Sequence, residues 1–191
     1  MQLFSYMTFS KNGQSLPCSI VRLSLEQINV ILSFQQYLCS CVEDPDTFVP
    51  LSRKEWEFLL CHGAAFAVFP EKERSDGFPA YLIGCLYPPD EENLGVDLGL
   101  SADELSHVAH LEIAMTHPDF RGYHMHSVMC RLCSDYLLRD GRIEFVIATV
   151  SPKNIPSRKA LESAGLRCML QKEKYGGKLR CIMMKEKGKQ R

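Results

Sequence analysis

The sequence predicts an α/β protein, with a mixed, mostly antiparallel twisted sheet and helices on both of its faces. Apolar, β-rich runs alternate along the chain with amphipathic segments of helical period. Several of these runs are joined by short glycine-containing links, which suit antiparallel neighbours. A length of 191 residues and a hydrophobic content of 46% suit one core, so we expect one domain over residues 1–191.

The charge balance gives no indication of a nucleic-acid partner. The chain has 22 basic and 23 acidic side chains and a formal net charge of -1, without the basic footprint of a nucleic-acid binder. No apolar run approaches the roughly 20 residues needed to cross a bilayer. Residues 1–14 lack the basic flank and long apolar core of a secretory signal. We therefore expect a cytoplasmic protein with no membrane partner.

Nine cysteines raise the question of a metal site, because Cys39 and Cys41, and Cys130 and Cys133, are closely spaced. Their number is odd, and both pairs fall inside predicted helices. A zinc site would need two further ligands at matched spacing. We interpret Cys130 and Cys133 as small core residues and expect no metal.

The first element is a hairpin. Strand-like residues 7–10 and 17–23 flank Asn12-Gly13, the strongest short hairpin signal. Ser24 then opens a helix, with Gln27 in the position that completes a capping box. Its apolar side is formed by Ile28, Ile31, Leu32, Phe34 and Leu38.

A second helix, 53–61, is capped by Ser52. Runs 64–69 and 80–87 read as two strands of a meander. Residues 88–106 are less regular and contain a short capped helix at 101–105. This segment could cover a pocket or form a surface loop.

The most informative stretch is 108–166. A strand at 108–116 leads into the Pro118-Asp119 turn and residues 121–126, after which a helix begins at once. N–H groups at a helix start lack partners within the helix and carry partial positive charge, so a tight loop there suits a phosphate. A strand and a helix capped by Asn154 follow, and a hairpin, 167–174 and 178–184, ends the pattern.

Residues 111–166 of this stretch resemble the acetyl-CoA cradle of the GCN5-related N-acetyltransferase (GNAT) superfamily, and most of the chain resembles this family more weakly. Arg121 and Gly122 match the start of an Arg/Gln-x-x-Gly-x-Gly/Ala pyrophosphate loop, and Pro118 matches the proline that commonly precedes it. The resemblance implies a GNAT-like acyl-CoA N-acyltransferase fold with acetyl-CoA as co-substrate. The cofactor-binding residues that it implies are Met115, Thr116, Arg121, Gly122, Tyr123, His124, Met125, His126, Ser127, Asn154 and Ser157.

Two histidines depart from the family loop. His124 occupies a position where the family usually has glycine, and His126 occupies one where it usually has glycine, alanine or another tolerated residue. A ring N–H could donate to phosphate, more strongly when protonated. This reading predicts coenzyme A binding that tightens modestly toward pH 6. In the alternative, both rings face solvent or cap the helix.

Acetyl transfer to an amine needs a base, because a lysine-like amine with a pKa of about 10.4 is mostly protonated at neutral pH. Strand pleating puts His110 and Glu112 on one face of strand 108–116, opposite Leu111, Ile113 and Met115. Several members of the family use a glutamate on the corresponding strand. We expect Glu112 to receive the proton and His110 to orient it or relay from it; the alternative is a polar structural cluster.

Many members of the family protonate the departing thiolate with a tyrosine on the last helix. In this sequence, Leu161 stands at that position. Tyr123, His124 or Tyr175 could substitute. A thiol with a pKa of about 8.5 can also leave without an acid.

The sequence thus predicts an acetyl-CoA-dependent N-acetyltransferase acting on a primary amine of a small molecule or peptide. The alternatives are a non-catalytic acyl-CoA binder or sensor, and an O-acyltransferase. Because many members of the family are dimers, the resemblance also allows a homodimer.

Overall fold

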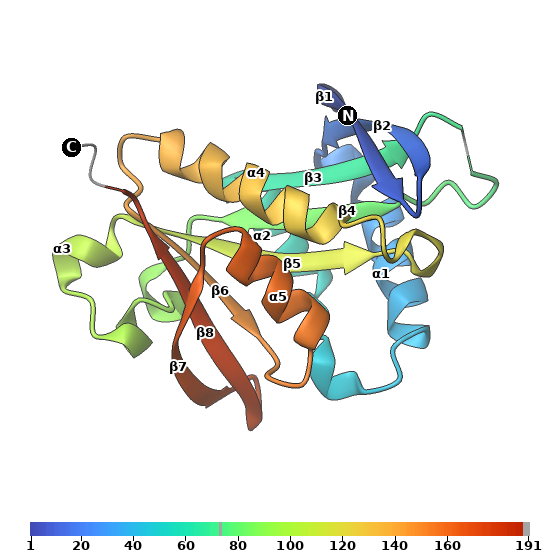
Figure 1. The fold of residues 1–191 in the computed structure, drawn as a ribbon. Coiled ribbons are helices and arrows are strands. Elements are labelled where there is room, and N and C mark those ends of the chain that lie inside the picture. The colour runs from blue at the N-terminus through green and yellow to red at the C-terminus, as the bar shows by residue number, and fades with distance from the viewer. Residues whose placement is uncertain (73, 189–191) are drawn as a thin grey trace. The chain divides into compact units, whose positions relative to one another are not determined.

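A computed structural model describes residues 1–72 and 74–188 and confirms the α/β fold (Figure 1). The strands are β1 (Gln2–Lys11), β2 (Gln14–Arg22), β3 (Gly63–Pro70), β4 (Tyr81–Leu86), β5 (Val108–Thr116), β6 (Phe145–Val150), β7 (Arg167–Lys174) and β8 (Lys178–Glu186). The α-helices are α1 (Ile28–Ser40), α2 (Arg53–His62), α3 (Ala102–Leu105), α4 (Met125–Arg139) and α5 (Ile155–Ser163). Short 3-10 turns are η1 (Leu25–Gln27), η2 (Pro45–Thr47), η3 (Asp90–Glu92), η4 (Val96–Leu98) and η5 (Pro118–Phe120).

The chain divides into two compact units. The first comprises Met1–Gly84 and Ile113–His126, and the second comprises Cys85–Glu112 and the described residues from Ser127 onward. Strands follow the order β1-β2-β3-β4-β5 in the first unit and β5-β6-β8-β7 in the second. The β5–β6 pair is parallel, whereas β1–β2, β2–β3, β6–β8 and β7–β8 are antiparallel. The predicted mixed, mostly antiparallel sheet is therefore confirmed.

The predicted N-terminal hairpin is present in the first unit, with longer strands than the sequence indicated. Lys11 pairs with Gln14 across a two-residue turn. Asn12 and Gly13 have φ values of 50° and 79°. Two consecutive left-handed residues are what a type I′ turn requires, which explains the Asn-Gly sequence.

The helices of the first unit share a polar contact inside an apolar core. Trp56 of α2 is fully buried, and its indole N–H donates to Gln35 Oε1 of α1 at 3.0 Å. Gln35 also exchanges two hydrogen bonds with the backbone of Leu51, at 2.7 and 3.0 Å. The capping box predicted for the first helix is present at Ser24 and Gln27, and Ser52 caps α2. These bonds satisfy donors that helix starts and burial would otherwise leave unpaired.

Residues 88–106 pack against the strands of the second unit, to which they belong. Leu94 is 5% exposed and belongs to an apolar cluster with Val108, Phe145, Ile147 and Ile182. Asn93, also buried, donates to Leu105 O and accepts from the Gly95 N–H group, both at 2.9 Å. The segment is therefore anchored at Asn93 and Leu94 by polar and apolar contacts, while most of its other residues lie at the surface.

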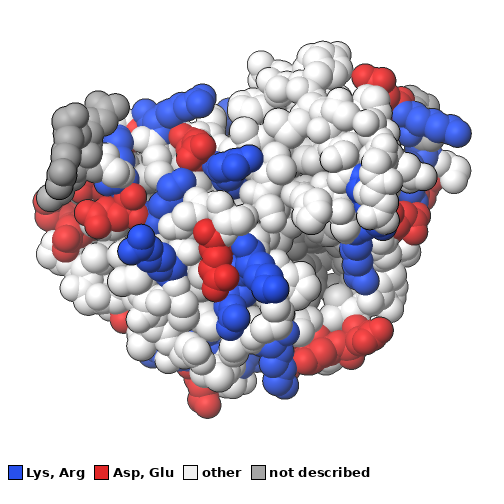
Figure 2. Space-filling view, in the orientation of Figure 1, with Lys and Arg blue, Asp and Glu red and all other residues white. Residues whose placement is uncertain are grey.

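Cys130 and Cys133 on α4 are buried, as predicted for small core residues. Within residues 1–72 and 74–188, no three His, Cys, Asp or Glu side chains converge as a metal ion would need. No helix in the same ranges is long and apolar enough to span a bilayer. Charged side chains of both signs occur on the face drawn in Figure 2.

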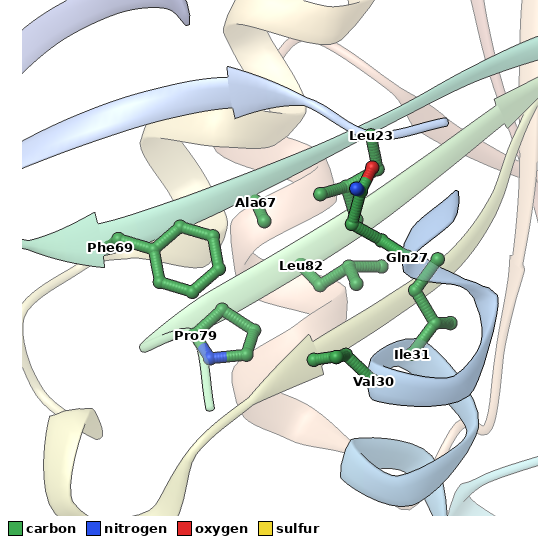
Figure 3. A pocket seen from close by; sticks show the side chains of 8 residues that line it. All are labelled: Leu23, Gln27, Val30, Ile31, Ala67, Phe69, Pro79 and Leu82. Atoms are coloured by element: carbon green, nitrogen blue, oxygen red, sulfur yellow. The ribbon is translucent and has the colours of Figure 1, made fainter. Parts of the chain in front are cut away.

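A small hollow in the first unit lies among β2, β3, β4 and α1 (Figure 3). It is lined by Leu23, Gln27, Val30, Ile31, Ala67, Phe69, Pro79 and Leu82. Ligand sites combine apolar walls with several converging polar groups, and only Gln27 is polar here. We therefore assign no ligand to this hollow.

Candidate active site

The predicted phosphate loop joins β5 to α4. Two backbone hydrogen bonds shape it, from Arg121 N–H to Pro118 O at 3.2 Å and from Tyr123 N–H to Phe120 O at 3.4 Å. Helix α4 begins at Met125, directly after the loop. The first four N–H groups of a helix have no partner within it and carry partial positive charge, so the end of this loop suits an anion.

Two residues of this loop have left-handed backbone conformations. The φ values of Gly122 and His124 are 89° and 59°. Glycine adopts such values without steric cost, which gives a physical reason for glycine in the family loop. A residue with a β-carbon pays about 1–2 kcal/mol there. His124 therefore keeps a glycine-like backbone at a cost in stability, and its side chain is exposed.

His126 turns toward the interior of the first unit. Its Nδ1 lies 2.8 Å from the Tyr81 hydroxyl. Loss of hydration lowers the pKa of His126 to about 4. A ring with this pKa stays neutral at pH 6, which argues against tighter phosphate binding by His126 at that pH. That prediction now applies to His124 alone.

Lys11, at the end of β1, also contacts the loop, which the sequence did not indicate. Its Nζ donates to Arg121 O at 2.8 Å and lies 5.7 Å from the centre of the Tyr123 ring. A β-carbon placed on Gly122 would lie 3.0 Å from Lys11 Cε. The hairpin signal predicted the turn beside Lys11, but it gave no information on what this side chain would reach.

An ion-pair network supports the turn that precedes the loop. Arg74 binds Asp76 and also donates to Asp119 at 3.2 Å. This guanidinium holds the pKa of Asp76 at about 2. His117, 1% exposed, stacks on Tyr37 at a ring distance of 5.1 Å. Burial and then the Arg74 charge lower the pKa of His117, which favours its neutral form. Together, these contacts hold η5 against α1.

Strand β5 carries the predicted catalytic pair in its second-unit half. His110 is 2% exposed, and its Nδ1 lies 3.4 Å from Glu112 Oε2. On its other side, the ring accepts a hydrogen bond at Nε2 from the Leu94 N–H group, at 3.3 Å. Because Nε2 is an acceptor, a neutral ring carries its proton on Nδ1, facing the carboxylate. The structure thus brings His110 and Glu112 together and fixes the ring from the 88–106 segment.

The described pairing between β5 and β6 lies just before this carboxylate. β5 pairs with β6 from Val108–Phe145 to Leu111–Ala148. The register within the described second unit does not extend to the next positions, Glu112 and Thr149. Farther along β5, Met115 is buried and Thr116 is half-buried.

Tyr175, in the β7–β8 turn, belongs to the surroundings of Glu112. Its hydroxyl is 3.1 Å from Thr149 Oγ1, and the Arg180 guanidinium lies 5.9 Å from its ring centre. Although 43% of the residue is exposed, loss of hydration at the phenol raises the pKa of Tyr175. The Thr149 hydrogen bond opposes this shift, and the charge of Glu112 adds to it. Tyr175 is therefore a proton donor in its resting form.

Asp97 ties the 88–106 segment to β7. Its two carboxylate oxygens accept from Lys172 and Lys174, each at 2.6 Å, and its side chain is 9% exposed. The two lysines lie near the Tyr175 turn in sequence, whereas Asp97 lies three residues after Leu94. One double ion pair thereby fastens the segments that carry Tyr175 and the amide that binds His110.

The Asn154 cap of the last helix is confirmed. Asn154 Oδ1 accepts from the Ser157 N–H group at 3.2 Å and satisfies one of the free donors at the start of α5. Leu161, where the family usually has tyrosine, is 4% exposed and therefore packs in the core. The half-buried Ser127 lies in the first turns of α4.

The predicted site residues fall in both units. The first unit contains Met115, Thr116, Arg121, Gly122, Tyr123, His124, Met125 and His126. The second contains His110, Glu112, Ser127, Asn154 and Ser157. Sequence reasoning missed Lys11, the Leu94 amide and Thr149. A backbone amide leaves no trace in residue type, and the other two side chains carry no motif.

No family model matches the chain, and no curated protein matches it in sequence. Solved structures do match it. A GNAT-family acetyltransferase from Streptococcus pneumoniae has a TM-score of 0.65 at 13% identity, covering 90% of this chain and 99% of that one. The NatC complex bound to Gag peptide and CoA has a TM-score of 0.63 at 13% identity, covering 87% of this chain and 98% of that one. An aminoglycoside acetyltransferase in complex with coenzyme A and kanamycin has a TM-score of 0.58 at 10% identity, covering 88% of this chain and 94% of that one.

The chain therefore has the fold of the GNAT acetyltransferases, and the resemblance found in residues 111–166 is confirmed at the level of the fold. At identities of 10–13%, the reaction must be argued from the chain's own residues.

Proposed function

We propose that this chain is an acetyl-CoA-dependent N-acetyltransferase that acts on a primary amine of a small molecule or peptide. The observation that carries the proposal is the His110–Glu112 pair on β5, the strand that leads into the predicted phosphate loop. The Leu94 amide fixes the His110 ring of this pair. Likeness to acetyltransferases solved with coenzyme A supports the same reading. We also propose that residues 1–191 act as one domain.

In the proposed reaction, the amine nitrogen attacks the thioester carbonyl carbon directly. Glu112 takes the proton of the amine, directly or through one water, and His110 holds the carboxylate in position through Nδ1–H. Backbone N–H groups near Ile113, Met115 and Thr116 stabilise the oxyanion; such donors contribute roughly 3–4 kcal/mol each. The C–N bond forms, the C–S bond breaks, and coenzyme A leaves as thiolate.

The thiolate then takes a proton. Among Tyr123, His124 and Tyr175, we favour Tyr175 because its hydroxyl lies 3.1 Å from Thr149 Oγ1 and its phenol is close enough to Glu112 to feel that charge. A thiol of pKa about 8.5 is also a tolerable leaving group without help, so this step does not depend on Tyr175.

The loop supports coenzyme A as the acyl carrier. Gly122 and His124 have the left-handed conformations discussed above, and α4 begins directly after them. We assign the diphosphate to residues 121–127 and the pantetheine arm to Asn154 and Ser157. The cap at Asn154 uses its side-chain oxygen, which leaves its amide N–H groups for this contact.

A thiol-release assay with acetyl-CoA and a panel of amines, peptides and alcohols tests the proposal. We expect turnover with an amine, and we expect Glu112→Gln to lower kcat/KM by about 10²–10⁴-fold and to remove the acidic limb of the pH profile. Glu57→Gln, which removes a carboxylate that is 45% exposed on α2, is the matched control and should behave as wild type. An unchanged rate and pH profile in the Glu112 variant, with a confirmed acceptor, would show that the base assignment is wrong.

The second candidate is a non-catalytic acyl-CoA sensor. It is favoured by Leu161 at the usual tyrosine position and by His124 at a glycine position. Binding of acetyl-CoA without turnover on any acceptor in the panel would select it. Turnover with alcohols alone would instead select O-acyl transfer.

A further inference from the structure

Lys11 contacts the proposed diphosphate loop from outside the loop's own sequence. Its Nζ donates to Arg121 O at 2.8 Å, and its stem passes beside Gly122. The residue is half-buried, whereas Arg121 and Gly122 are exposed. Its ammonium group therefore lies at the position in the loop where the resemblance places a doubly charged diphosphate.

The chain holds this side chain in place by two means. The Asn12-Gly13 turn fixes the end of β1, because Lys11 pairs directly with Gln14 across two residues of left-handed backbone. The Tyr123 ring, 5.7 Å from Nζ, adds a cation–π contact. Because the side chain is already ordered, little conformational freedom is left to lose when a ligand binds.

The ammonium group has unused hydrogen-bonding capacity. A lysine carries three N–H donors, and the contact with Arg121 O uses one of them. A phosphate oxygen is a stronger acceptor than a carbonyl oxygen, because hydrogen bonds between charged groups are shorter and roughly twice as strong. Lys11 can keep the carbonyl contact and donate to phosphate as well.

We propose that Lys11 binds the diphosphate of coenzyme A and so completes the phosphate site from the N-terminal hairpin. This inference rests on the proposed function, since it concerns the same cofactor. It also accounts for Gly122 beyond its backbone conformation. Any side chain there would meet Lys11 Cε, Cδ and Nζ at 3.0–3.4 Å and push the ammonium group away from the loop.

The test is calorimetric titration of coenzyme A and of dephospho-coenzyme A, which lacks the 3′-phosphate but keeps the diphosphate. The proteins are wild type, Lys11→Met, Lys11→Arg and Lys54→Met. Methionine keeps the apolar stem and removes the charge, whereas arginine keeps the charge. Lys54 is exposed on α2 and gives a control with the same loss of charge.

We expect Lys11→Met to weaken both ligands by about tenfold, in line with the loss of one charge-assisted hydrogen bond. Lys11→Arg should stay within about threefold of wild type, and Lys54→Met should be unchanged. Raising the salt concentration should weaken wild-type binding more than that of Lys11→Met.

Three outcomes would overturn the inference. If Lys11→Met binds both ligands as wild type does, Lys11 only packs on the loop, and the proposed function is unaffected. If it weakens coenzyme A but not dephospho-coenzyme A, the contact is to the 3′-phosphate. If wild type binds neither ligand, the proposed function fails and this inference fails with it. Thermal denaturation of each variant distinguishes a change in binding from a change in folding.

Discussion

The contact between the Leu94 amide and His110 can be tested without knowing which substrate receives the acetyl group. The Leu94 N–H group is buried and donates to His110 Nε2 at 3.3 Å. Replacing His110 with leucine keeps an apolar side chain at the site but removes the acceptor. A buried donor left unsatisfied costs about 1–3 kcal/mol, so we expect His110→Leu to lose that much in free energy of unfolding.

Glutamine supplies the discriminating variant. Its side-chain oxygen can reach roughly the position of Nε2, so His110→Gln should recover most of the stability that His110→Leu loses. Asparagine is shorter and mimics the Nδ1 position, so His110→Asn should remain close to the leucine variant. Neither glutamine nor asparagine can accept from Leu94 and donate to Glu112 as the imidazole does, and both should lose catalytic rate.

Urea denaturation of the ligand-free protein, followed by circular dichroism at pH 7.5, measures these differences. Long-range ¹H–¹⁵N correlation spectra report the tautomer directly and should show the proton on Nδ1 of His110. Equal stabilities for the leucine and glutamine variants, or a proton on Nε2, would refute the reasoning. The positioning role proposed for His110 would then have to be abandoned.

Two further predictions concern the loop histidines. His124→Gly should raise the free energy of unfolding by about 0.5–1 kcal/mol, because relief of the positive φ outweighs the greater freedom of unfolded glycine; a lower melting temperature would contradict this. The folded pKa of His126 is about 4, below its ordinary 6.5, so its contribution to stability is complete above pH 6.5 and is lost as the pH falls toward 4. Urea midpoints should therefore fall less between pH 7 and pH 5 in His126→Asn, and parallel falls would argue against a neutral buried ring.

The order of the elements could be predicted because their signals are local. The strand at 108–116 was predicted with the bounds that the structure gives, and Ser52, Ser101 and Asn154 cap the helices that follow them. Hydrophobic period, capping residues and the Asn12-Gly13 pair act within a few positions of the chain. Strand ends were less accurate, because pairing with a neighbour extends a strand beyond its apolar run.

The environment of each candidate side chain was less predictable. The sequence placed His110 and Glu112 on one face, but it gave no sign of Leu94, sixteen residues earlier, as the partner that sets the tautomer. It also treated His124 and His126 alike. In the structure, His124 has a strained, exposed position, whereas His126 packs near Tyr81 and has a lowered pKa.

The sequence by itself determined the fold class and the order of helices and strands, since those follow from period and residue type. Its resemblance to a known family indicated the candidate base and phosphate loop. Only the tertiary structure decided that Lys11 reaches the loop, that residues 88–106 fix His110, and that His126 is neutral. Hydrogen bonds and desolvation depend on atoms brought together from distant parts of the chain, and no local pattern specifies them.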